Sequence, residues 1–192
     1  MTKIAVIIGS TREGRMTDKL ANWATKAVEQ KADVEVLDLR DYPMPFFDEA
    51  ISPRYNPERK AVPEVQKWLD KVAEFDGYVI VTPEYNRAPT GVLKNALDVL
   101  AYEMDHKPVA IVAHGSSGGA QAVASLRITL PGVGAVALPQ ALFFTDQVGA
   151  AIDDDGVLKA ELAENPYGHQ ANLVTQTDTL VKFAEALKSL RG

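Results

Sequence analysis

Residues 3–17 read KIAVIIGSTREGRMT, and this stretch decides the predicted fold. It opens with an apolar, mostly β-branched run from Ile4 to Ile8, which is typical of a buried strand. Gly9 ends this run, and an amphipathic pattern typical of a helix begins at Thr17. The stretch therefore predicts a strand, a short turn and a helix.

The turn between this strand and this helix combines hydroxyl side chains with two arginines, at Ser10, Thr11, Arg12, Arg15 and Thr17. The start of a helix leaves backbone N–H groups unpaired and carries partial positive charge. Guanidinium groups add full charges that bind phosphate oxygens through paired hydrogen bonds. An ordinary capped turn would explain one hydroxyl residue here, but it explains two clustered arginines poorly. We therefore predict that this turn binds a phosphate group.

The overall composition fits one domain with one core, spanning residues 1–192, because 46% of the residues are hydrophobic and 24% are charged. The formal net charge of −6 argues against non-specific binding to nucleic acid or to anionic membranes. The sequence has no cysteine, and no apolar run approaches the roughly 20 residues that span a bilayer. We therefore expect a soluble cytoplasmic protein.

Five runs have the length and apolar pattern of strands: Ile4–Ile8, Asp33–Leu39, Gly77–Thr82, Pro108–Ala113 and Val136–Phe144. Stretches of helical periodicity alternate with them, at Thr17–Gln30, Ala61–Phe75, from near Gly91, from Ala120 and after Tyr167. This alternation predicts a doubly wound α/β fold with helices on both faces of a parallel sheet. Five strands favour the flavodoxin-like order 2-1-3-4-5.

Two segments between these elements are predicted to be irregular. Asp41 to Pro57 contains four prolines, which predicts a loop without regular structure. Its aromatic pair, Phe46 and Phe47, either ties the loop to the core or forms a pocket wall or subunit contact. Val148 to Gly156 is predicted to be an acidic surface loop. Pro139 predicts a bulge or an edge position for the last strand.

Three conspicuous loops follow the first, third and fourth strands. In a sheet of this order, ligands bind beyond the carboxyl ends of the strands, at the switch point between strands 1 and 3. The turn after the first strand, TPEYNRAPTG at 82–91 and HGSSGG at 114–119 should therefore meet at one crevice. The small residues of the last loop would let a flat ring approach, and backbone N–H groups there could stabilise negative charge.

Two nucleotide-binding motifs match only in part. Gly9 and Gly14 have the spacing that opens a phosphate loop of nucleotide triphosphatases, but Arg15 and Met16 replace its Lys and Ser/Thr. The glycine fingerprint of dinucleotide-binding folds is absent. Asp38 is therefore expected to cap a turn rather than to bind a ribose.

A serine hydrolase is a further alternative. Gly115 to Gly119 matches the G-x-S-x-G nucleophile elbow, with Ser117 as the nucleophile. Asp146 or Asp153, followed by His169, completes the chain order of a triad. This interpretation leaves the two arginines of the first turn without a role. The histidines have no metal-ligand spacing, so no metal site is expected.

The three loops together resemble the NADPH-dependent FMN reductase family, which includes flavin, quinone, azo and chromate reductases. The resemblance is carried by GSTREGRMTDKLANW at 9–23, TPEYNRAPTGVLKNALD at 82–98 and HGSSGG at 114–119. It implies a flavodoxin-like domain with FMN as cofactor and NAD(P)H as co-substrate. It also implies a homodimer or homotetramer, with the flavin near a subunit interface.

The resemblance further implies which residues bind FMN. The phosphate would be held by the first turn, at Ser10, Thr11, Arg12, Arg15, Met16 and Thr17. One side of the isoalloxazine would be lined by Pro83, Glu84, Tyr85 and Asn86. Its other edge would be bounded by Gly115, Ser116, Ser117 and Gly118.

The implied reaction is a ping-pong transfer of hydride from NAD(P)H to FMN and then to a flavin, a quinone or a similar small acceptor. Because the flavin supplies this chemistry, no catalytic side chain is predicted. A flavodoxin-type electron carrier and a flavin-free scaffold are alternatives. Flavodoxins typically have a Ser/Thr-rich phosphate loop without arginines, so the two arginines favour the enzyme.

Overall fold

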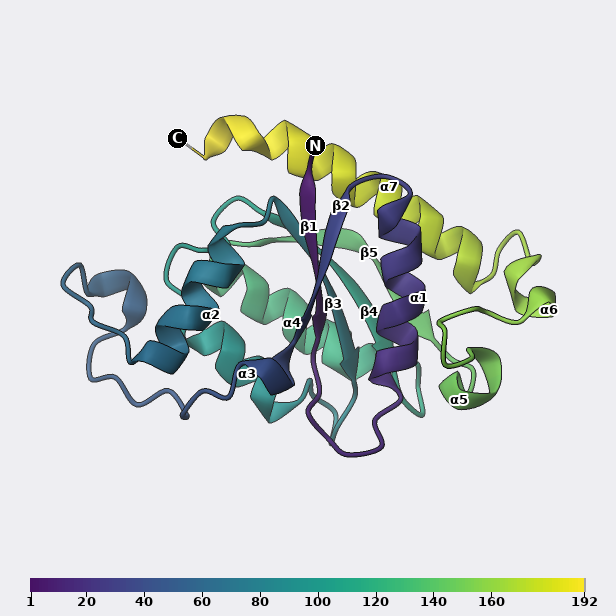
Figure 1. The fold of residues 1–192 in the computed structure, drawn as a ribbon, viewed down its shortest axis with the longest axis horizontal. Coiled ribbons are helices and arrows are strands. Elements are labelled where there is room, and N and C mark those ends of the chain that lie inside the picture. The colour runs from purple at the N-terminus through teal and green to yellow at the C-terminus, as the bar shows by residue number, and fades with distance from the viewer. Residues whose placement is uncertain (192) are drawn as a thin grey trace.

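The computed structural model describes residues 1–191. Its centre is a sheet of five parallel strands in the order β2-β1-β3-β4-β5, which confirms the predicted topology (Figure 1). The strands are β1 (Lys3–Ile8), β2 (Asp33–Asp38), β3 (Gly77–Pro83), β4 (Pro108–His114) and β5 (Val136–Phe144). The register slips between Val109 and Ile111 where β4 meets β5, so the edge strand carries the irregularity predicted from Pro139.

Helices cover both faces of this sheet (Figure 1). The long ones are α1 (Thr17–Glu29), α2 (Pro63–Ala73), α3 (Gly91–Asp98), α4 (Ala120–Gly132) and α7 (His169–Ala186). Helices α1 and α7 lie on one face, and α2, α3 and α4 lie on the other. Because side chains alternate along a strand, Ile4 and Val6 pack toward α1 and α7, while Ala5 and Ile7 pack toward α2, α3 and α4.

Short helical turns occur in the segments that were predicted to be irregular. A 3₁₀ turn, η2 (Pro53–Tyr55), starts at one of the four prolines, and this corrects the prediction, since proline is compatible with a first helical position. Two more one-turn helices are α5 (Val148–Ala151) and α6 (Ala160–Ala163).

Helix α5 corrects the prediction of a loop from Val148 to Gly156, because Val148 and Ala151 are buried and anchor it on the core. The acidic run from Asp153 to Asp155 is exposed, as predicted. The 3₁₀ turns η1 (Leu39–Asp41) and η3 (Leu187–Leu190) complete the order of elements. None of the helices within residues 1–191 combines the length and the apolarity needed to cross a membrane.

Candidate functional site

The carboxyl ends of β1, β3 and β4 lie side by side, and hydrogen bonds tie their three loops together. The Ser10 Oγ lies 3.2 Å from the hydroxyl oxygen of Tyr85, which joins the first loop to the second. The Thr17 Oγ1 lies 3.1 Å from Nε2 of His114, which joins the first loop to the third. The backbone N–H of Glu84 donates to the carbonyl of His114 over 2.9 Å, which joins the second loop to the third. The loops singled out from the sequence therefore form one site.

The first loop exposes its tip and buries its two ends. Residues 11–14 are exposed, whereas Ser10 and Thr17 are fully buried. Gly14 has a φ of +64°, a left-handed conformation that glycine adopts without strain. Within residues 1–191, the Arg12 guanidinium has no hydrogen bond or ion pair, so its charge is available to a ligand.

Arg15 has a different environment from Arg12. Its buried side chain donates to both carboxylate oxygens of Asp38, with a distance of 2.8 Å from Nη1 to Oδ1. It also donates to the Asp18 carboxylate and to the carbonyl of Ser10. These bonds place Arg15 behind the loop, and its direct contact with phosphate stays a prediction.

Asp38 and Arg40, at the end of β2, support the same loop. Asp38 accepts a hydrogen bond from the backbone N–H of Arg40 over 2.9 Å, which confirms the predicted turn cap. Burial alone would raise the pKa of Asp38, but the hydrogen bonds from Arg15 and Arg40 outweigh burial and hold that pKa below its usual value. The Arg40 side chain donates to the carbonyl of Arg12 over 2.6 Å. Arg40 was not singled out from the sequence. The strand order could have indicated it, because β2 ends beside β1 and Arg40 follows the end of β2.

The second loop, after β3, is a tight hairpin. Tyr85 and Ala88 exchange two backbone hydrogen bonds, of 2.9 Å and 3.1 Å. The two residues between them, Asn86 and Arg87, both have positive φ, as in a type I′ turn. Thr90 caps α3 as predicted, since its hydroxyl accepts from the backbone N–H of Leu93 over 3.1 Å.

Glu84 directs its carboxylate at the start of α4 rather than into the crevice. Its Oε2 accepts from the backbone N–H groups of Gln121 over 2.8 Å and of Ala122 over 3.3 Å. A carboxylate is stabilised at a helix start by the unpaired N–H groups and by the helix dipole. Pro83, which ends β3, is buried. The backbone of this loop, rather than the Glu84 side chain, is therefore the part that can face a ligand.

The third loop depends on glycine. Gly118 and Gly119 have φ values of +63° and +80°, and they are buried. A Cβ on Gly119 would lie 2.5 Å from the Cβ of Ala113, and one on Gly118 would lie 3.1 Å from the Cβ of Phe143. Ser116 and Ser117 are exposed beside them. The turn therefore presents small groups and backbone to the crevice.

His114 connects this turn to the first loop. Burial lowers the pKa of His114 to about 4, so the ring is neutral at neutral pH. A neutral imidazole can accept from or donate to the Thr17 hydroxyl without placing a charge in the crevice. His114 is thus a structural tie within the site.

The hydrolase triad is not assembled. His169 Nε2 lies 2.8 Å from Oδ2 of Asp146, and the His169 ring stacks on Phe144 with centroids 4.3 Å apart. Within residues 1–191, however, no hydrogen bond joins Ser117 to either of them. A nucleophile needs a base within hydrogen-bond reach, so this arrangement does not favour serine hydrolysis.

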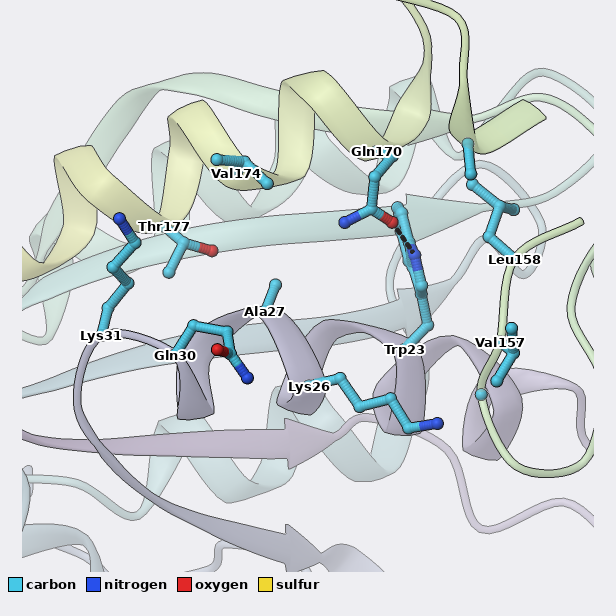
Figure 2. A pocket seen from close by; sticks show the side chains of 12 residues that line it. Trp23, Lys26, Ala27, Gln30, Lys31, Val157, Leu158, Gln170, Val174 and Thr177 are labelled. Carbon is cyan, nitrogen blue, oxygen red and sulfur yellow. Dashed lines mark hydrogen bonds between the residues drawn. The ribbon is translucent and has the colours of Figure 1, made fainter. Parts of the chain in front are cut away.

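A cavity of about 390 Å³ lies elsewhere, between α1 and α7 (Figure 2). Two of its lining residues are joined by a hydrogen bond of 2.7 Å from Trp23 Nε1 to Gln170 Oε1. Lys26, Gln30 and Lys31 form one side of it. None of the predicted cofactor-binding residues lines this cavity.

The backbone and charges of the crevice fit a flavin phosphate. Within residues 1–191, the N–H groups of Thr11, Glu13 and Gly14 form no hydrogen bond, and the free Arg12 guanidinium lies beside them. Unpaired backbone N–H groups that lie close together in one loop can bind anions. The third loop, on the other side, consists of small residues and backbone, because close packing and positive φ values exclude larger side chains at Gly118 and Gly119.

The chain is similar to known proteins in both sequence and structure. A family model described as NADPH-dependent FMN reductase matches residues 2–149. The chain is 35% identical over 136 residues to the NAD(P)H-dependent FMN reductase ntnL of Nectria sp, which covers 68% of each chain. It is 34% identical over 137 residues to a 2-hydroxy-1,4-benzoquinone reductase of Burkholderia sp, which covers 68% of this chain and 69% of that protein.

A solved structure also resembles this chain along nearly all of its length. It is FerB, a flavoenzyme NAD(P)H:(acceptor) oxidoreductase from Paracoccus denitrificans, with a TM-score of 0.76 at 26% identity. The match covers 97% of this chain and 98% of that chain.

Proposed function

Because this chain belongs to the NADPH-dependent FMN reductase family, we propose that it is an FMN-dependent oxidoreductase that oxidises NAD(P)H and reduces a small acceptor such as a flavin or a quinone. The observation that carries the proposal is the first loop, residues 9–16, which we call the phosphate loop. It has unpaired backbone N–H groups and the Arg12 guanidinium, which has no partner within residues 1–191. Hydrogen bonds join this loop to the two other loops at the same end of the sheet. The quinone substrate named for the Burkholderia relative supports the acceptor class.

Different loops of the crevice would bind the phosphate and the ring of FMN. The phosphate would be bound at Ser10, Thr11, Arg12 and Thr17, and by the start of α1. The flat ring would lie between the backbone of the second loop, at 83–86, and the glycine turn at 115–118. Gly118 packs against Phe143 and Thr145 and has a positive φ, so glycine is needed there to form the turn.

When bound, FMN would accept a hydride from NAD(P)H and pass two electrons to the acceptor. The protein contributes binding, orientation and electrostatics. Within residues 1–191, the backbone N–H groups of Ser116 and Ser117 form no hydrogen bond, so they can stabilise negative charge that develops near them. His114 is held neutral by burial and engaged with Thr17, so it is not needed as an acid or base. The family resemblance implies ping-pong kinetics, with NAD(P)H and the acceptor using the same face of the flavin in turn.

We further propose that the chain works in the cytoplasm as a homodimer or homotetramer. Phe46 and Tyr55 are each 82% exposed and Ile51 is 53% exposed, all within the proline-rich segment between β2 and α2. Tyr102, which packs against Arg54 of this segment, is 59% exposed. Exposed aromatic side chains gathered on one segment are typical of a protein–protein contact.

The proposal is tested by an absorption spectrum of the purified protein, followed by anaerobic addition of NADPH. We expect the bands of oxidised flavin, either as purified or after adding FMN, and we expect them to bleach on addition of NADPH. Steady NADPH oxidation with a quinone would then separate the enzyme from a flavodoxin-type carrier, which needs a partner reductase. Protein that stays colourless in excess FMN would contradict the proposal, and labelling of Ser117 by a fluorophosphonate would support the hydrolase.

A further inference from the structure

Two arginines bind the back of the phosphate loop. Arg15 donates from Nη1 to the carbonyl of Ser10. Arg40 donates from Nη2 to the carbonyl of Arg12 over 2.6 Å, and its Nε lies 3.4 Å from the carbonyl of Thr11. The carbonyls of three consecutive residues of this loop therefore point toward the guanidinium groups of Arg15 and Arg40.

This arrangement fixes the direction of the N–H groups. In a trans peptide the C=O of one residue and the N–H of the next point in opposite directions. Carbonyls of residues 10 and 12 that face the arginines turn the N–H groups of Thr11 and Glu13 to the other side of the loop. Within residues 1–191, neither of these N–H groups has a partner, so both are free to bind an anion.

Asp38 holds the more buried of the two arginines in place. Its two carboxylate oxygens accept from Nη1 and Nη2 of Arg15, a paired geometry that fixes the plane of the guanidinium. Asp18 accepts from Nε of the same group. Two carboxylates thus offset the Arg15 charge, whereas the Arg12 guanidinium has no carboxylate partner within residues 1–191.

We propose that Arg15 and Arg40 are positioning residues, which aim the backbone N–H groups of the loop at the phosphate of FMN, and that Asp38 sets the orientation of Arg15. This inference rests on the proposed function for the identity of the ligand. It makes Asp38 a determinant of phosphate affinity without any contact between Asp38 and the phosphate.

The sharpest variant is Asp38→Asn, because simple electrostatics and positioning predict opposite results. Removing a negative charge near a bound phosphate would strengthen FMN binding if charge alone mattered. If Asp38 positions the loop, the variant loses paired hydrogen bonds to Arg15 and binds FMN about tenfold more weakly. Affinities for FMN and for riboflavin would be measured by quenching of flavin fluorescence, and the riboflavin affinity should not change.

A matched control exists at the other end of the sheet. Asp105 makes a similar paired contact with Arg54, with N–O distances of 2.7 Å and 3.1 Å, and Arg54 also donates to a carbonyl, that of Ala101. We expect Asp105→Asn to leave the FMN affinity unchanged. Arg15→Lys is a second variant: it keeps the charge but loses the fork geometry, so it should bind FMN as weakly as Arg15→Gln.

The outcomes separate this inference from the proposed function. Wild-type protein that binds no FMN would refute the proposed function. FMN binding that Asp38→Asn strengthens or leaves unchanged would overturn the positioning role alone. A third measurement needs no flavin: addition of inorganic phosphate should shift the amide NMR signals of Thr11, Glu13 and Gly14 in wild type, and much less in Asp38→Asn. Equal shifts in the two proteins, or none in wild type, would also overturn it.

Discussion

Arg12 and Arg15 are three residues apart in one loop, yet the fold gives them opposite surroundings. Arg15 is buried against two carboxylates and a carbonyl, and Arg12 is exposed with its guanidinium free among residues 1–191. Arg15 therefore holds the loop in place through hydrogen bonds, whereas Arg12 is a candidate phosphate ligand. Sequence alone treats the two as equivalent, since both follow the first strand closely.

At the residue scale, Arg12→Ala should lose FMN on purification and regain its NADPH oxidation rate in excess FMN. A charge-assisted hydrogen bond contributes about 1.5–3 kcal/mol, so the FMN affinity should fall by one to two decades. Flavin content after gel filtration measures the loss. Lys26→Ala, which removes an exposed cation on α1, is the control. Arg12→Ala protein that remains fully flavinated would contradict this role.

At the scale of elements, hydrogen bonds connect the ends of the strands around the site with the starts of neighbouring helices. Glu84 follows β3 and caps α4, and Thr90 caps α3 while its hydroxyl donates to the carbonyl of Gly9 over 2.5 Å. His114 ends β4 and meets Thr17 at the start of α1. Each helix start that surrounds the crevice is therefore held by a residue from a different strand's loop.

The tie at His114 predicts a pH dependence of stability. The folded pKa of about 4 lies below the ordinary value of 6.5, so the unfolded chain binds more protons between these values. The free energy of unfolding should therefore fall as the pH drops through this window, by on the order of 1–2 kcal/mol at about pH 5. Urea unfolding at about pH 7.5 and about pH 5 measures the loss.

His114→Asn should show a smaller loss of stability over the same interval, because the titrating ring is gone. His106→Asn is the matched control, since His106 is exposed and lies outside the crevice. Equal losses in wild type and His114→Asn would show that other groups cause the acid destabilisation.

At the scale of the whole molecule, one sheet with two helical layers leaves the loops at one end free to form the site. Each of the two helical layers packs on the sheet through its own cluster of buried apolar residues. The loops therefore contribute few residues to the core. The proline-rich segment between β2 and α2 keeps several large apolar side chains exposed, among them Phe46, Ile51 and Tyr55. That exposure motivates the proposed self-association.

The corresponding prediction is that Phe46→Asp weakens the oligomer. Placing a charge in an apolar contact should raise the dissociation constant on the order of tenfold or more. Sedimentation velocity over a range of concentrations measures the change. Tyr167→Asp, at a side chain that is 89% exposed on another segment, should leave the association unchanged. Wild-type protein that sediments as a monomer throughout would contradict the proposal.

The fold and the place of the site follow from short stretches of sequence. Apolar runs of strand length that alternate with amphipathic helices predict the parallel sheet and its order, because right-handed crossovers leave few topologies. The same order brings the loops at 9–16, 82–91 and 114–119 together. Local pattern could not predict α5, because its anchors Val148 and Ala151 are too few to show a helical period.

By itself, then, the sequence determined which loops form the crevice and that one of them carries two arginines. Only the tertiary structure decided what each arginine does. Arg15 meets Asp38, which is 23 residues away, and Arg40 reaches the carbonyl of Arg12, because β2 pairs in parallel with β1 and both strands end at the same edge. Such partners depend on strand pairing and side-chain direction, which no local sequence pattern encodes.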